Sequence, residues 1–254
     1  MGIIAVFYGA DHKCGTSMLA QSAAEYAAEK NKDMNVLLIH TESGCGELYC
    51  PSVSESLESI RPYLAEKLID SRALIEKSRY KDNLFIIGGP VKPGSSALYQ
   101  PDMAQYLLDS LSASFDIVIC DAGAEFEHAM SLGALFSADK IFVVTTQHEH
   151  AVRRYEWTKA LFKKLGINPS AVIVNCYSSF GINTPEMISE RAEISEDRLL
   201  FVRKSENGQR AEEDNRTILS LRDVRFTKDI AKICERILTA DSGSDAKLRG
   251  TEEE

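Results

Sequence analysis

Short apolar segments rich in β-forming residues alternate with longer helix-like segments along almost the whole chain. Most of the short segments are continuously apolar, which is typical of strands covered on both faces of a sheet. They span residues 3–8, 36–40, 84–87, 116–120, 140–145, 171–175 and 199–202. The helix-like segments span residues 17–29, 54–77, 104–112, 150–165, 185–192 and 225–239. This alternation predicts an α/β fold with a doubly wound, mostly parallel sheet and helices on both faces.

The domain organisation follows from length and composition. The chain has 254 residues and contains no internal repeat, low-complexity segment or Pro/Gly-rich linker that would divide it. We therefore predict one domain over residues 1–240. Residues 241–254 are polar and end in three glutamates, which predicts a disordered acidic tail.

Charge and hydropathy argue against several classes of function. The net charge of −9 disfavours a broad electrostatic contact with nucleic acid. The basic pairs Arg153–Arg154 and Lys163–Lys164 are interpreted as a solvated helix face. No apolar run approaches the ~20 residues that cross a bilayer, and the start of the chain does not have the pattern of a secretion signal.

Cysteine usage indicates the compartment. The six cysteines are scattered and form no CxxC pair, which predicts free thiols in a reducing cytoplasm. Cys45 and Cys50 are the one close pair, and the sequence gives little support to a metal or redox role for them.

The stretch after the first predicted strand has the layout of a phosphate-binding loop that runs into a helix. It reads Gly9-Ala10-Asp11-His12-Lys13-Cys14-Gly15, followed by Thr16 and Ser17 and a helix of small residues. In such a loop, backbone N–H groups and the positive end of the following helix bind phosphate. A lysine after the last glycine normally reaches the outer phosphates, and a Ser or Thr hydroxyl holds magnesium. Here no lysine follows the glycine.

Two registers of this loop are compatible with the sequence. Counting from Gly9 as the first glycine puts Cys14 at the second glycine, Gly15 at the lysine and Thr16 at the magnesium ligand. Counting back from the helix keeps Gly15 as the second glycine, so that Thr16 replaces the lysine and Ser17 holds magnesium. We favour the second register, because it retains glycine where the backbone most needs it. Lys13, inside the loop, either supplies the missing charge from another direction or is a solvent-exposed loop residue.

Several segments together resemble the ParA/MinD group of P-loop ATPases, whose loop reads KGGxGKT[ST]. The segment FDIVICDAG is similar to that group's acidic strand end, with Asp121 and Gly123 in place. The segment SADKIFVVTTQHEHAVRR resembles the next strand of the group, and AVIVNCY resembles the strand whose terminal asparagine, here Asn175, faces the adenine base. The resemblance covers nearly all of residues 1–240, and the altered loop looks most like the TadZ/CpaE branch of the group.

The resemblance implies a site for ATP and Mg²⁺ beyond the carboxyl ends of the strands. Magnesium would be held by Asp121 together with Thr16 or Ser17. The group carries a D-x-D pattern after its second strand, where this chain has His40 and Glu42. Glu42 is the candidate for ordering the attacking water, alongside Asp121 as the second catalytic candidate, and His40 is interpreted as structural. The implied nucleotide-binding residues are Gly9, Asp11, His12, Lys13, Cys14, Gly15, Thr16, Ser17 and Asn175.

The missing lysines bear on function. The group's signature lysine, which reaches the partner's phosphates across a dimer, is replaced by Ala10 or Asp11, so both lysines of the usual set are absent. We therefore expect nucleotide binding with slow or absent hydrolysis, because positive charge placed where charge develops drives phosphoryl transfer.

Three functional hypotheses follow. The leading hypothesis is an ATP-binding protein that forms a homodimer and recruits or positions an unidentified protein partner, with no nucleic acid and no direct membrane anchor. The alternative is a nucleotide-free pseudo-ATPase scaffold. A metabolic P-loop enzyme or metal-cluster carrier is disfavoured, because the chain has no CxxC pair and no second catalytic constellation.

Overall fold

The computed structural model describes residues 2–42, 49–50, 53–92 and 94–239 of the chain. Its centre is a nine-stranded sheet in the order β3-β5-β2-β6-β1-β7-β8-β9, and β4 pairs with β5 outside this path. The β4–β5 pair is antiparallel and the other pairs are parallel, so the predicted doubly wound α/β fold is confirmed. The strands are β1 (Ile3–Gly9), β2 (Val36–His40), β3 (Glu55–Ser56), β4 (Arg79–Lys81), β5 (Leu84–Gly88), β6 (Ile117–Asp121), β7 (Lys140–Thr146), β8 (Ala171–Tyr177) and β9 (Leu199–Arg203).

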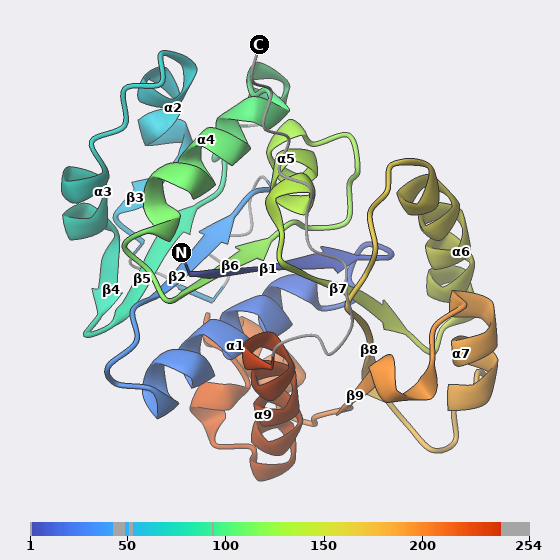
Figure 1. Cartoon of the computed structure of the whole chain (residues 1–254). Coiled ribbons are helices and arrows are strands. Elements are labelled where there is room, and N and C mark those ends of the chain that lie inside the picture. Colours follow the sequence, from blue (N-terminus) through green and yellow to red (C-terminus); the bar gives the residue numbers. More distant parts are fainter. Residues whose placement is uncertain (1, 43–48, 51–52, 93, 240–254) are drawn as a thin grey trace.

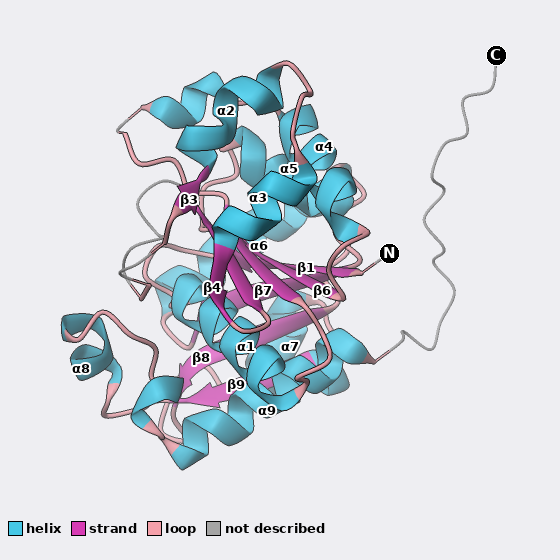
Figure 2. Ribbon diagram, turned by 90° about the vertical axis from the view of Figure 1, so that its left-hand side faces the viewer, coloured by secondary structure: helices cyan, strands magenta, loops and turns pink. Residues whose placement is uncertain are grey.

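Helices cover both faces of this sheet, as predicted. Figure 1 shows α1 and α9 below the sheet and α2, α4 and α5 above it, with α6 and α7 beside β7 and β8. The view along the sheet in Figure 2 separates the same two layers. The helices are α1 (Thr16–Lys30), α2 (Leu57–Ala65), α3 (Ser71–Ser78), α4 (Pro101–Ser112), α5 (Ala129–Ser137), α6 (Glu149–Lys164), α7 (Pro185–Ala192), α8 (Gly208–Glu213) and α9 (Val224–Leu238).

Each face of the sheet has its own hydrophobic core. On the lower face, the small buried side chains of α1, such as Ala20 and Ala24, allow that helix to pack closely against the sheet and against α9. In α9, Ile230 and Ile233 are fully buried at helical spacing. Its first turn is capped by Asp223, whose carboxylate accepts hydrogen bonds from the N–H groups of the next turn.

The strand order places three strand ends side by side. β1 lies between β6 and β7, and β6 lies between β1 and β2. In this register Asp121 pairs with Phe7 of β1 and with His40 of β2. Because parallel strands end at one edge of a sheet, the loops after β1, β2 and β6 meet there.

One predicted helix was wrong. Residues 54–77 were expected to form a single helix, but the structure has β3, then α2, then α3 in this segment. Lys67 adopts a left-handed conformation (φ 55°) that ends the helical path. Asp70 then caps a new helix, because its carboxylate accepts a hydrogen bond from the N–H of Ala73.

The sequence did not indicate α5, α8, β3 or β4, which are short or lack a clear hydrophobic period. The predicted acidic tail and Cys45 lie outside the described residues. The five other cysteines are free thiols. Within the described ranges, no helix combines the length and the apolar character that a membrane span requires.

Candidate functional site

The loop after β1 is held from both sides by the neighbouring strands. The N–H of Gly9 donates to the carbonyl of Gly123 after β6 at 2.6 Å, and the N–H of Ala10 donates to Val144 of β7 at 2.8 Å. The loop therefore begins at the centre of the sheet edge, where an open α/β sheet binds its ligands.

Gly15 forms the junction between the loop and α1. It is the residue before the helix and is left-handed, with φ 85° and ψ 24°. A Cβ at this position would lie 2.3 Å from Nδ2 of Asn175. The same Nδ2 donates a 2.8 Å hydrogen bond to the carbonyl of Cys14, so the end of β8 supports the loop directly. The ParA/MinD resemblance implies a different contact for Asn175, with an adenine base, and that contact stays a prediction.

The first turn of α1 has the properties of an anion-binding helix end. Within residues 15–18, all of which the structure describes, no side chain forms a capping hydrogen bond and no residue is acidic. Unpaired N–H groups and the helix dipole therefore favour an anion here. Thr16 is buried and Ser17 is half-buried. The hydroxyl of Thr16 is turned towards Gly9, since a Cβ on Gly9 would lie 2.6 Å from its Oγ1.

Cys14 is part of the hydrophobic core rather than a reactive group. Its side chain is 3% exposed and belongs to the core on the α1 side of the sheet. Burial raises the pKa of its thiol to about 11, so the thiol is neutral at physiological pH. The loop therefore contains no thiolate nucleophile at this position.

Ion pairs connect the loop to its surroundings. The carboxylate of Asp11 lies 2.5 Å from Nδ1 of His150 and 3.7 Å from Nε of Arg154, both on α6. His12 pairs with Glu125, which lies in the loop after β6. Lys13 is exposed, has φ 60°, and forms no ion pair with any described residue. Lys13 is thus the cationic side chain that the loop exposes without an ion pair in the described part of the chain, while Asp11 and His12 tie the loop to α6 and to the loop after β6.

The ends of β2 and β6 are joined by a buried polar pair. Nδ1 of His40 lies 2.9 Å from Oδ2 of Asp121, and both side chains are fully buried. The other carboxylate oxygen, Oδ1, accepts a 3.3 Å hydrogen bond from the N–H of Gly123. Thr41 binds the backbone carbonyl of Asp121 through its N–H and its hydroxyl, at 2.9 and 3.1 Å. Nε2 of His40 is buried without a hydrogen-bond partner among the described residues.

Glu42 follows this pair and lies against the loop after β6. Its Oε2 accepts a hydrogen bond from the N–H of Ala124 at 3.2 Å, and a Cβ on Gly123 would overlap with it at 1.3 Å. Burial raises the pKa of Glu42, and the nearby charge of Asp121 raises it further, while His128 lowers it. The predicted role of Glu42 at an attacking water stays a prediction.

Among the residues predicted to hold magnesium, Asp121 does not fit that role as it is arranged, whereas Ser17 is half-buried at the start of α1. Both side-chain oxygens of Asp121 have hydrogen-bond partners, and its side chain has no exposed surface. The hydroxyl of Thr16 is turned towards Gly9. Nowhere in the described ranges do three or more His, Cys, Asp or Glu side chains form a group that could hold a metal ion. The predicted metal role of Asp121 stays a prediction, and this geometry gives its carboxylate another partner.

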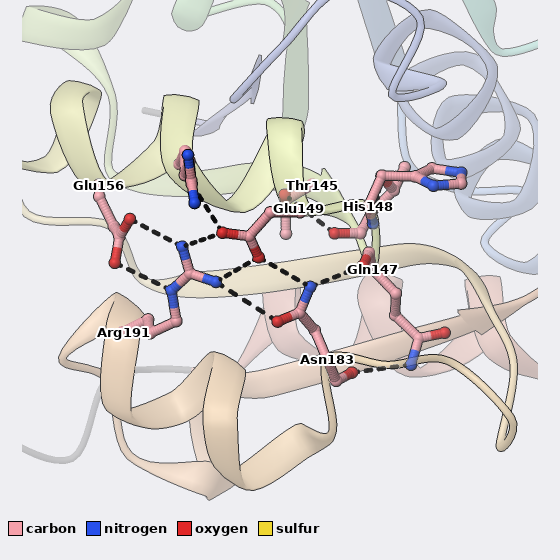
Figure 3. Close-up of polar contacts among 9 residues, drawn as sticks. Thr145, Gln147, His148, Glu149, Glu156, Asn183 and Arg191 are labelled. Carbon is pink, nitrogen blue, oxygen red and sulfur yellow. Dashed lines mark hydrogen bonds and ion pairs between the residues drawn. The ribbon is translucent and has the colours of Figure 1, made fainter.

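A polar network beside the loop was not found from the sequence. Figure 3 shows the guanidinium of Arg191 on α7 between Glu149 and Glu156 of α6. Its nitrogens bind the two carboxylates at 2.8–3.2 Å. Asn183 and Gln147 extend the network to the loop between β8 and α7. Hydrogen bonds from Arg191 lower the pKa of Glu149 to about 2 and also lower that of Glu156.

This network fixes α6 and α7, and therefore the position of the cations that face the loop. The sequence gives only one hint of it. Glu149 and Glu156 lie two helical turns apart and so share a face of α6. Their partner Arg191 lies much later in the chain, and the sequence around Arg191 does not predict the ion pairs.

Comparisons with known proteins identify the fold. No family model and no curated protein matches the chain. A ParA family ATPase from Chlorobium tepidum TLS is 18% identical, with 92% of this chain and 98% of that chain covered and a TM-score of 0.78. The chain has the fold of the ParA/MinD ATPases.

Two further solved structures extend the comparison. The MinC:MinD cell division protein complex from Aquifex aeolicus is 14% identical, over 96% of this chain and 99% of that chain, with a TM-score of 0.73. The septum site-determining protein MinD from Pyrococcus horikoshii OT3, complexed with Mg-ADP, is 15% identical, over 93% and 96%, with a TM-score of 0.66. At these identities the likeness establishes the ParA/MinD fold and no activity.

Proposed function

We propose that this chain binds ATP at the loop between β1 and α1. The observation that carries the proposal is the uncapped N-terminus of α1, which follows a tight loop at the centre of the sheet edge in a ParA/MinD fold. Backbone N–H groups at such a helix start bind phosphate without side-chain charge. A ParA/MinD-like structure in complex with Mg-ADP supports nucleotide as the ligand.

The geometry of Gly15 supports the second loop register. In the KGGxGKT[ST] pattern, the last glycine directly precedes the helix, and Gly15 has this place with a left-handed backbone. Thr16 then stands where the lysine does, and Asp11 stands where the signature lysine does. Loss of a cation that stabilises the transition state costs on the order of 10³-fold in rate, so we propose weak or absent hydrolysis.

ATP then acts mainly as an assembly ligand. A ligand that binds a dimer better than a monomer shifts the population towards the dimer. We propose a homodimer that meets across the loop and that recruits or positions a protein partner. A complex with a protein partner among the similar structures, MinC:MinD, supports this role. Because its loop is altered, we propose that the chain belongs to the TadZ/CpaE branch. We also propose that it acts in the cytoplasm.

A nucleotide-free scaffold is the second candidate function. The favouring observation is that two residues expected to contact the nucleotide or its metal have partners within the chain: Asp121 is buried against His40, and Asn175 binds the backbone of the loop. In this case the chain dimerises through the same surface without ATP.

The test measures nucleotide binding in the wild type and in a variant that should weaken phosphate binding without destabilising the fold. Ser17→Asp adds a carboxylate to the first turn of α1, which favours the helix but repels phosphate. The matched control is Ser71→Asp, the same change in the first turn of α3. Binding of a fluorescent ATP analogue in magnesium buffer is measured by titration, and dimerisation by sedimentation velocity with and without ATP.

The two candidate functions give different results. For an ATP-binding dimer, the wild type and Ser71→Asp bind the analogue and dimerise with ATP, and Ser17→Asp loses at least about tenfold in affinity. For a nucleotide-free scaffold, the wild type dimerises without ATP and does not bind the ATP analogue. If Ser17→Asp binds as the wild type does, the phosphates do not lie at the start of α1.

A further inference from the structure

The pair formed by His40 and Asp121 lies where a ParA/MinD site would hold its metal. The two residues are register partners at the ends of β2 and β6, directly beside the β1 loop. Their side chains meet at 2.9 Å and are fully buried. Such a contact satisfies the carboxylate with a hydrogen-bond donor from the protein itself.

Release of Asp121 to a metal would disrupt several contacts at once. Its Oδ2 would leave His40, its Oδ1 would leave the N–H of Gly123, and the side chain would have to reach solvent. Nε2 of His40 already lacks a partner among the described residues, so both ring nitrogens would then be buried and unpaired. An unpaired buried polar group is costly, which keeps the pair closed.

The neighbouring carboxylate, that of Glu42, does not replace Asp121 as a metal ligand. Glu42 is bound to the N–H of Ala124 and lies over Gly123. The side chains that can balance phosphate charge are cationic residues at the loop. Lys13 is exposed and free of any described ion pair, and Arg154 on α6 lies beside Asp11.

We propose that Asp121 serves as the buried partner of His40 and not as a magnesium ligand, so that the loop binds the phosphates of a nucleotide without a divalent cation. This inference rests on the proposed nucleotide binding at the same loop. It departs from the Mg²⁺ site that the resemblance implies, because Asp121, the carboxylate that should hold the ion, is engaged by His40 and by the N–H of Gly123.

The first experiment compares affinity in two buffers. A fluorescent ATP analogue is titrated into the full chain in magnesium chloride and in excess EDTA. We expect dissociation constants that agree within about twofold. Asp121→Asn keeps an oxygen that can accept the hydrogen bond from His40, so its affinity should match the wild type in both buffers.

The second experiment uses magnesium alone, without nucleotide. His40→Asp places two buried carboxylates against each other, and a divalent cation would relieve their repulsion. We expect magnesium chloride to raise the Tm of His40→Asp, while the Tm of the wild type stays unchanged. Should this variant not fold, Asp121→Asn and the comparison of buffers still decide the question.

Three results would overturn the inference. Binding that weakens more than about tenfold in EDTA would show a metal-dependent site. Loss of binding in Asp121→Asn only when magnesium is present would make Asp121 a metal ligand. In either result the wild type still binds ATP in magnesium buffer, so the proposed function stands. Absence of binding in both buffers would instead refute the proposed function, and the metal-free binding with it.

Discussion

Replacement of Gly15 by alanine tests how the candidate loop rests on the sheet. Gly15 has φ 85°, and a Cβ there would lie 2.3 Å from Nδ2 of Asn175. The alanine therefore meets two separate penalties. The first is the left-handed backbone, and the second is displacement of an amide that binds the carbonyl of Cys14 at 2.8 Å.

The two penalties can be estimated separately. A left-handed alanine costs about 1–2 kcal/mol. Loss of the buried hydrogen bond between Asn175 and Cys14 adds about 1–3 kcal/mol, because Asn175 is only 8% exposed. Gly15→Ala should therefore lower the free energy of unfolding by about 3 kcal/mol. Gly166→Ala is the matched control, since Gly166 has φ 68° and nothing lies within 4 Å of its added Cβ, so it should cost about 1 kcal/mol.

A double-mutant cycle isolates the contact. In an Asn175→Ala background the amide is already gone, so Gly15→Ala should cost only the backbone penalty of about 1–2 kcal/mol. Any effect on the helix cap is common to both backgrounds and cancels. Urea unfolding followed by far-UV circular dichroism gives all four free energies. Additive effects within about 0.5 kcal/mol would refute the placement of Asn175 beneath the loop.

Three further predictions concern charged groups outside the loop. Arg191→Met should lower the free energy of unfolding by about 1 kcal/mol, and by less at high salt, because the guanidinium binds the partly exposed carboxylates of Glu149 and Glu156; urea unfolding at two salt concentrations checks this. Arg191 lowers the pKa of Glu149 from 4.5 to about 2, so its stabilising effect is complete above pH 4.5 and is lost as the pH falls through about 2. The wild type should therefore lose stability relative to Glu149→Gln across that window. Burial raises the pKa of Glu25, although a hydrogen bond from the hydroxyl of Thr217 lowers it, so ionisation of Glu25 opposes folding. Urea unfolding should therefore show Glu25→Gln gaining stability over the wild type as the pH rises from 4.5 towards neutrality.

The central strands could be predicted because they are buried on both faces. In the strand Val36–His40, for example, every residue is buried, and its first four residues appear in the sequence as a continuous apolar run. Helices with one buried face were likewise evident, as in α9, where Ile230, Ile233 and Ile237 recur at helical spacing. From these elements, a mostly parallel sheet with helices on both faces follows by the rules for α/β folds, whereas the order of the strands was not predicted.

Other elements carry little periodic signal. The sequence of α5 is apolar or small on most sides, and the helix packs so closely that a Cβ on Gly133 would lie 2.1 Å from the carbonyl of Pro101. Such a helix cannot be distinguished from a buried strand by periodicity alone. The break between α2 and α3 depends on the capping contact of Asp70 and on the left-handed Lys67, which hydrophobic patterns do not contain.

The position of the candidate site could be predicted, but the partners of its residues could not. The spacing of glycines placed the loop at the start of α1. The position of Asp121 at the end of an apolar strand, together with the ParA/MinD resemblance, placed it beside that loop. The contact between His40 and Asp121 joins residues that are distant in sequence and depends on strand register. A histidine at a strand end is compatible with many roles, so its buried contact is visible only in the fold.

The charges of the loop also bear on how two chains could meet. Under the proposed second register of the loop, the lysine that reaches across the dimer to the partner's phosphates in the ParA/MinD resemblance falls at the position of Asp11. Here that position is acidic and is paired within its own chain, to His150 and Arg154 of α6. A carboxylate facing a partner's triphosphate would repel it, and these two cations reduce that repulsion. It follows that an ATP-dependent dimer of this chain would lack the lysine's attraction across the interface, and that its affinity would depend on Lys13 and on neutralisation of Asp11 by α6.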